Sequence, residues 1–156
     1  MTEFIRREAW GAQQRGYNNT TLFSYPGESD VIAFITAAAA MLELSDGVGE
    51  ALGFRGRYAP RRDQVPAVVI PWFGVAEVHQ GNTLGFEVHT QLLENIRDSM
   101  AASRFIWLEV WEGSPALEFY EDAGYIQIGT SSDIAPDGHA RSLLKLALDR
   151  AAVPNT

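Results

Sequence analysis

The sequence predicts a single α/β domain of the α+β type, and two neighbouring segments carry this prediction. Val68 to Val75 form an apolar run with the length of a buried strand. After a polar turn, apolar residues recur every fourth position from Leu84 to Met100, which indicates an amphipathic helix. A chain of 156 residues suits one domain spanning residues 1–156, because this length buries roughly two thirds of the unfolded surface.

The N-terminal part of the chain predicts a helix followed by a hairpin. Residues 2–17 place their apolar side chains on adjoining helical faces. The β-prone segments 21–25 and 31–36 flank a turn-rich connection, which indicates an antiparallel pair of strands. Alanines 37–40 have helical propensity, but the β-branched and aromatic residues before them favour a continued strand.

The remaining elements are shorter, and their boundaries are predicted from glycine, proline and other turn-forming residues. Residues 45–64 contain four glycines and no sustained period, so we expect a long loop with one helical turn near 50–54. Further along the chain we expect a strand at 104–110, a strand at 125–128, a polar loop at 129–138, and a strand or short helix at 141–148.

A short helix is expected between the strands at 104–110 and 125–128. Ser114 is a plausible N-cap and Pro115 suits the first helical position. The helix would run to Ala123 and stop at Gly124, since glycine readily takes the left-handed conformation that ends helices.

Composition excludes several classes of protein. The chain has 46% hydrophobic and 21% charged residues, as ordinary globular proteins do. It has no cysteine, so neither disulfides nor thiolate zinc sites are possible, and three histidines form no ligand cluster of familiar spacing. No apolar segment reaches the roughly 20 residues that a membrane-spanning helix needs. The start of the chain lacks the apolar core of a secretory signal, so we expect a cytoplasmic protein without metal.

The net charge of −8 is unevenly distributed along the sequence. Residues 1–64 hold seven arginines against eight acids, and residues 65–156 hold five basic residues against twelve acids. The four arginines at 55, 57, 61 and 62 form the one basic cluster, which suits a phosphodiester or a nucleotide phosphate, or simply a solvated loop. Nucleic-acid binders usually carry a larger basic face.

The turn between the strand and the long helix is a potential anion site. A helix N-terminus leaves several backbone N–H groups without intrahelical partners, and the helix dipole favours negative charge there. Phosphate groups are therefore common ligands of a glycine-bearing loop that precedes a helix.

This turn resembles the acetyl-CoA pyrophosphate loop of the GNAT superfamily of N-acetyltransferases. The family pattern is Gln or Arg, two residues, Gly, one residue, and Gly or Ala, after a strand that ends in an apolar triplet. Here Phe73-Gly74-Val75 matches the triplet, Gln80 and Gly85 match the ends of the loop, and Thr83 stands where the first glycine is expected. The resemblance implies acetyl-CoA contacts from Phe73, Val75, Gln80, Gly81, Asn82, Thr83, Leu84 and Gly85.

A second segment, Trp111 to Tyr125, resembles the other GNAT signature at the expected separation. The resemblance implies that Ser114 touches CoA and that Tyr120 faces the departing thiolate. It covers most of residues 20–148 and implies the GNAT fold, a central mixed, mostly antiparallel sheet flanked by helices. The segments before the motif strand also resemble the GNAT toxins of toxin–antitoxin pairs, which acetylate the α-amine of aminoacyl-tRNA.

The implied reaction is acetyl transfer from acetyl-CoA to a primary amine. The enzyme must hold the thioester, stabilise the carbonyl oxygen, accept a proton from the amine and return one to sulfur. Tyr120 suits the last task because its phenol is protonated at pH 7. Glu77, His79, Glu109 or a chain of waters are alternatives for the base. Aminoacyl-tRNA, an antitoxin protein and a second copy of the chain are partners that the resemblance leaves open.

Each of these residues also has a purely structural interpretation. Tyr120 beside Phe119 fits a core aromatic, Ser114 fits a helix cap, and His79 and His89 fit packing residues. Thr83 decides between two functions, because a β-branched residue resists the positive φ that glycine allows. The first function is an active N-acetyltransferase. The alternative is a GNAT-fold protein that has lost acetyl-CoA binding and acts by binding a protein partner.

Overall fold

The structure, a computed structural model, describes residues 10–16, 18–44, 64–99, 103–134 and 138–150. The predicted loop at 45–63, with its helical turn, and most of the predicted first helix lie outside these residues. The described elements, in chain order, are α2 (Trp10–Gln14), β1 (Asn19–Phe23), β2 (Ala33–Glu43), β3 (Gln64–Val75), the 3-10 helix η2 (Glu77–His79), α4 (Leu84–Ser99), β4 (Phe105–Trp111), α5 (Ala116–Asp122), β5 (Ile126–Ile134) and β6 (Ala140–Asp149).

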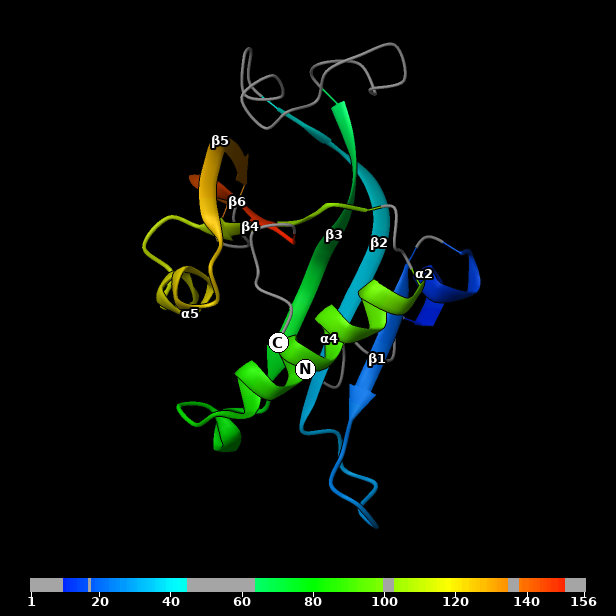
Figure 1. Cartoon of the computed structure of the whole chain (residues 1–156). Coiled ribbons are helices and arrows are strands. Elements are labelled where there is room, and N and C mark those ends of the chain that lie inside the picture. Colours follow the sequence, from blue (N-terminus) through cyan, green and yellow to red (C-terminus); the bar gives the residue numbers. More distant parts are fainter. Residues whose placement is uncertain (1–9, 17, 45–63, 100–102, 135–137, 151–156) are drawn as a thin grey trace. The chain divides into compact units, whose positions relative to one another are not determined.

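The six strands form one mixed sheet in the order β1-β2-β3-β4-β6-β5 (Figure 1). β3 and β4 are parallel, whereas β1 with β2, β4 with β6, and β5 with β6 are antiparallel. The predicted α+β class and the mixed, mostly antiparallel sheet are confirmed. The chain divides into two compact units, one with residues 1–39 and 70–101 and the other with residues 40–69 and 102–156.

The first unit holds the predicted hairpin and the long helix. β1 pairs with β2 from Asn19 opposite Ala37 to Phe23 opposite Ala33, and the alanines continue the strand as expected. Tertiary pairing overrides the helical propensity of alanine here. α4 runs from Leu84 to Ser99 with an apolar side buried through Val88, Leu92 and Ile96. The four-residue spacing seen in the sequence is therefore the packed face of this helix.

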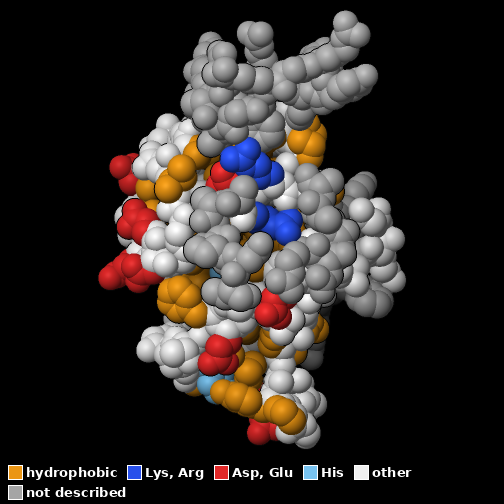
Figure 2. Space-filling model, viewed as in Figure 1, with side chains coloured by type: hydrophobic (Ala, Val, Ile, Leu, Met, Phe, Trp, Pro, Cys, Tyr) orange, Lys and Arg blue, Asp and Glu red, His pale blue; other side chains and the backbone are white. Residues whose placement is uncertain are grey.

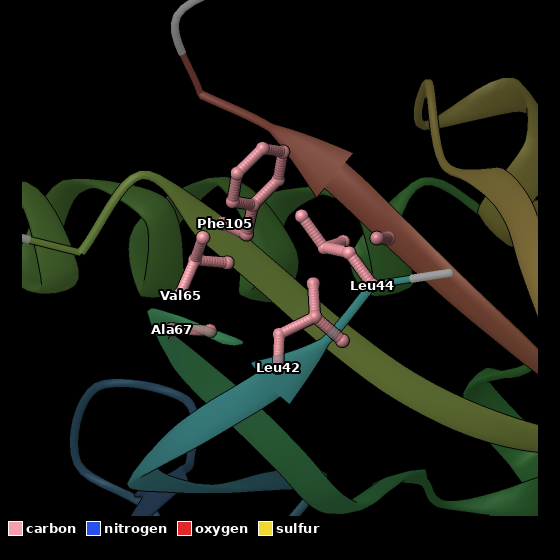
Figure 3. Close-up of a cluster of buried hydrophobic side chains, with 6 residues drawn as sticks. Leu42, Leu44, Val65, Ala67 and Phe105 are labelled. Carbon is pink, nitrogen blue, oxygen red and sulfur yellow. The ribbon is translucent and has the colours of Figure 1, made fainter. Parts of the chain in front are cut away.

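The second unit is built on β4 and β6, which are paired in register from Phe105 opposite Asp149 to Trp111 opposite Leu143. Arg104 closes one end of this pair by donating two hydrogen bonds, of 2.9 and 2.7 Å, to the Asp149 carboxylate. Figure 3 shows apolar side chains from neighbouring strands meeting over this region. The buried cluster consists of Leu42, Leu44, Val65, Ala67, Phe105 and Ala147.

The helix α5 ends as the sequence predicts. Gly124 takes a φ of +88°, and its N–H donates to Glu121 O while the Tyr125 N–H donates to Tyr120 O. This pair of bonds is the Schellman arrangement, which satisfies the last carbonyl groups of a helix and favours glycine.

Two local predictions differ from the structure, and a third, which left two alternatives open, is decided by it. α5 begins at Ala116 and its N-cap is Pro115, so Ser114, the expected N-cap, lies one residue before the observed one. Residues 129–134 belong to β5 instead of a polar loop, because they pair with residues 140–145 of β6. The C-terminal segment that fitted either a strand or a helix is the strand β6. Pairing across the sheet decided both of the latter cases, and local sequence does not encode that pairing.

Candidate functional site

The predicted phosphate loop lies in the first unit, between the end of β3 and α4. The Ala76 N–H donates to Ile32 O at 2.8 Å, which fixes the end of β3 to the start of β2. The next turn is held by bonds from His79 N to Ala76 O and from Gln80 N to Glu77 O. The Gln80 side chain then folds back, and its Nε2 donates to Val75 O at 2.9 Å. Gln80 thus closes the loop on itself.

The second half of the loop presents backbone donors at the start of a 16-residue helix. The Leu84 N–H donates to the Asn82 side chain at 3.0 Å. Within the described part of the chain, no acceptor is found for the N–H groups of Gly81, Asn82 and Thr83, and these residues are exposed. Exposed donors at the positive end of a helix dipole form a site that suits a phosphate.

Thr83 fits this loop without backbone strain. Among the described residues only glycines have positive φ, and the positive φ of this loop, +78°, is at Gly81. The concern raised by a β-branched residue at position 83 therefore does not apply to the backbone. The Thr83 hydroxyl instead donates to the Glu87 carboxylate at 2.9 Å, one helical turn away.

The apolar triplet before the loop is packed closely. Phe73, Gly74 and Val75 are half-buried at the end of β3. A Cβ atom built on Gly74 would lie 2.5 Å from Cε1 of the buried Phe34 ring. Glycine at position 74 is thus required by the approach of Phe34.

The surface beside the loop combines apolar and acidic side chains. Val78 is 86% exposed and Trp72 is 48% exposed. The His79 ring packs edge-on against Tyr25, with ring centroids 5.6 Å apart, and Glu77 is exposed. Figure 2 shows orange, red and pale blue side chains in the lower part of the view, where Figure 1 places this loop, and no blue Lys or Arg side chain is visible there among the described residues.

Tyr120 lies in the second unit, on α5. Its ring is 8% exposed and makes edge contacts with Phe119 and Tyr125, with centroids 5.1 and 5.5 Å away. Burial raises the pKa of Tyr120 to about 12, so the phenol keeps its proton at neutral pH. No hydrogen-bond partner of its hydroxyl is found among the described residues.

Ser114 and Glu109, both also in the second unit, already have partners. The Ser114 hydroxyl oxygen accepts a hydrogen bond from the Ala116 N–H at 3.3 Å. The exposed Glu109 carboxylate accepts one from the Ser131 hydroxyl at 2.9 Å. Its neighbour across the sheet, Lys145, places its ammonium group 5.1 Å from the centre of the Trp107 ring.

Sequence reasoning missed two features of the loop. It did not foresee that the Gln80 side chain bonds to Val75 O, and it overlooked Glu87. The spacing of Thr83 and Glu87 was a usable signal, because residues four apart on a helix are neighbours. Among the described residues, no cluster of three metal-ligating side chains occurs and no helix is long and apolar enough to cross a membrane.

Comparison with known proteins defines the class of the fold. No protein-family model matches the sequence, and no curated protein matches it. Solved structures do match, and they establish that the chain has the GNAT fold found in acetyltransferases and in GNAT-type toxins.

Three of the matching structures illustrate the identities and TM-scores found. A bacterial toxin is 14% identical, with a TM-score of 0.67, over 96% of this chain and 76% of its own. AtaT complexed with acetyl-methionyl-tRNAfMet is 11% identical, with a TM-score of 0.67, over 90% of this chain and 78% of its own. Arabidopsis thaliana NAA60 in complex with acetyl-CoA is 15% identical, with a TM-score of 0.61, over 83% of this chain and 72% of its own. At these identities the likeness shows the fold.

Proposed function

We propose that the protein is an acetyl-CoA-dependent N-acetyltransferase that acts on a primary amine. The observation that carries this proposal is the loop from Gln80 to Gly85, whose exposed backbone donors lie at the start of α4. A pyrophosphate is a doubly charged acceptor that suits such donors. The GNAT fold of structures that hold acetyl-CoA supports the same cofactor here.

In this proposal, separate groups of residues bind separate parts of acetyl-CoA. The loop residues Gln80 to Gly85 hold the pyrophosphate, with Gln80 shaping the loop through its bond to Val75 O. Phe73 and Val75, at the end of β3, offer backbone groups to the pantetheine arm and the thioester carbonyl, and Ser114 is a further proposed contact of CoA. Acetyl-CoA supplies the activated acetyl group, and the acceptor amine attacks its carbonyl carbon directly.

Tyr120 acts as the general acid. As the bond between carbon and sulfur breaks, the CoA thiolate needs a proton, and a phenol that is protonated at neutral pH can donate it. The lack of a hydrogen-bond partner among the described residues favours Tyr120 over a purely packing role. Glu77 and Glu109 are exposed carboxylates and serve as candidates for the base, together with His79 and water.

The finer proposal concerns the acceptor. AtaT has been solved with acetyl-methionyl-tRNAfMet and also with the antitoxin AtaR, so the α-amine of aminoacyl-tRNA is the first acceptor to test and an antitoxin is the first partner. A second function, partner binding without acetyl transfer, is favoured by the two exposed apolar side chains beside the loop, Val78 (86% exposed) and Trp72 (48% exposed).

Calorimetric titration of acetyl-CoA, followed by an acetylation assay with aminoacyl-tRNA and small amines, tests the proposal. Tyr120→Phe should bind acetyl-CoA as the wild type does but transfer acetyl about 10²- to 10⁴-fold more slowly, as expected for loss of a general acid. The control is Tyr125→Phe, which removes a hydroxyl from the neighbouring buried ring. Equal rates in Tyr120→Phe and wild type would exclude Tyr120 as the acid. No acetyl-CoA binding would favour the partner-binding function.

A further inference from the structure

We propose that Glu87 acts as an internal competitor of the cofactor pyrophosphate and thereby sets a low affinity of this chain for acetyl-CoA. The inference rests on the proposed function, because it assigns a role to a residue next to the proposed pyrophosphate loop. It concerns a side chain that lies outside the loop itself, on the first turn of α4.

Two hydrogen bonds link Glu87 to the loop. The Glu87 N–H donates to Thr83 O at 3.1 Å, and the Thr83 hydroxyl donates to Glu87 Oε1 at 2.9 Å. A threonine hydroxyl has a single proton. While Glu87 accepts that proton, Thr83 offers a phosphate no hydroxyl donor and presents only its backbone N–H.

The carboxylate also competes electrostatically. A negative charge in the first helical turn compensates the partial positive charge at the N-terminus, which is the same charge that attracts a phosphate. No lysine or arginine occurs from residue 64 to residue 96, whereas three acids do, Glu77, Glu87 and Glu94. This segment therefore contains no lysine or arginine that could offset the repulsion between Glu87 and a bound pyrophosphate.

Glu87 should consequently have opposite effects on the free and the bound protein. In the free protein it stabilises α4 through the dipole and through Thr83. In the complex it repels the pyrophosphate and retains the Thr83 proton. Removal of its charge should therefore lower the melting temperature of the free protein and raise its affinity for acetyl-CoA, a combination that a merely structural residue would not produce.

The experiment titrates acetyl-CoA and acetyl-pantetheine, which lacks the pyrophosphate, into wild type and Glu87→Gln. Glutamine keeps the size of the side chain and can still accept the Thr83 proton, so this variant isolates the charge. The matched control is Glu94→Gln on the same helix, where the carboxylate accepts a hydrogen bond from Gln91 at 3.3 Å.

We expect Glu87→Gln to bind acetyl-CoA about 3- to 10-fold more tightly than wild type, as befits one repulsive charge near a solvated anion. Acetyl-pantetheine affinity and the Glu94→Gln control should be unchanged. Equal or weaker acetyl-CoA binding by Glu87→Gln, or an equal gain for acetyl-pantetheine, would overturn the inference. Binding by Glu87→Gln alone would contradict the proposed function of the native chain and support the inference. The absence of binding in both proteins would overturn both.

Discussion

At Gly74, the packing of a neighbouring side chain restricts which residue the sequence can hold. It belongs to the apolar triplet that precedes the proposed pyrophosphate loop, and a Cβ atom there would lie 2.5 Å from Phe34 Cε1. Phe34 is 6% exposed, so its ring has little room to move. The sequence reveals the glycine but not its neighbour, because Phe34 lies on another strand.

Gly74→Ala should therefore destabilise the protein by about 1–3 kcal/mol, as overpacking of a filled core usually does. Urea denaturation measures this change in the free energy of unfolding. Gly129→Ala is the control, because a Cβ atom at Gly129 meets no atom within 4 Å. Adding Phe34→Leu to Gly74→Ala should recover part of the loss, since the two substitutions share one contact. Equal stability of the Gly74→Ala and Gly129→Ala proteins would contradict the packing argument.

The properties of Thr83 were only partly predictable from the sequence. The motif comparison correctly identified position 83 as unusual. Whether a β-branched residue is strained there depends on φ, and the structure places the positive φ at Gly81. The hydrogen bond to Glu87 depends on the first turn of α4, whose i and i+4 geometry could have been used in advance.

The helix α4 was the most predictable element, because its buried side chains repeat every four residues over 16 residues. Strand β5 was less predictable. Its residues are mostly polar and exposed, and its extent to Ile134 is set by pairing with β6, including a register shift near Gln127. Local sequence encodes an apolar face well, whereas it encodes the length of an exposed edge strand poorly.

α4 also carries a buried titratable group, His89, which is 3% exposed. Burial lowers its pKa from 6.5 to about 4, so between these values the unfolded chain binds a proton that the folded chain excludes. The contribution of His89 to stability is therefore complete above about pH 6.5 and is lost as the pH falls towards 4. The loss amounts to at most about 3 kcal/mol.

Urea denaturation between pH 7.5 and 4.5 tests this expectation. The free energy of unfolding should decrease with falling pH in wild type, and the decrease should be smaller in His89→Gln, which has no group to protonate. His139→Gln serves as the control because His139 is exposed. Parallel pH profiles for wild type and His89→Gln would show that burial of His89 does not govern acid sensitivity.

At the scale of the whole molecule, the order of elements along the chain was predictable and the order of strands in the sheet was not. Hydrophobic patterns indicated the hairpin, the long helix and the later strands. They contain no signal that places β6 between β4 and β5, because that position depends on pairing between distant segments. The resemblance to the GNAT family predicted a central, mixed and mostly antiparallel sheet, which the structure confirms, but it did not include the order of the strands.

The overall charge bears on the choice of acceptor. A net charge of −8 opposes RNA, and most of the local compensation comes from arginines 55, 57, 61 and 62. We expect tRNA to bind weakly at physiological salt, and the logarithm of its association constant to fall with the logarithm of salt concentration with a slope of about −3 to −4, as roughly four phosphate contacts predict. Filter binding at several salt concentrations measures both quantities.

Replacement of the four arginines by glutamine should bring this slope close to zero, whereas Arg141→Gln in β6 should leave it nearly unchanged. Loss of acetylation of aminoacyl-tRNA in the four-arginine variant, with acetylation of a small amine retained, would place the tRNA contact in that segment. A slope much steeper than −4 in wild type would contradict the expectation, because it would require a basic surface larger than this sequence supplies. If tRNA fails to bind at low salt, the acceptor is an amine without a nucleic-acid backbone, and the acidic surface beside the loop then favours a cationic substrate.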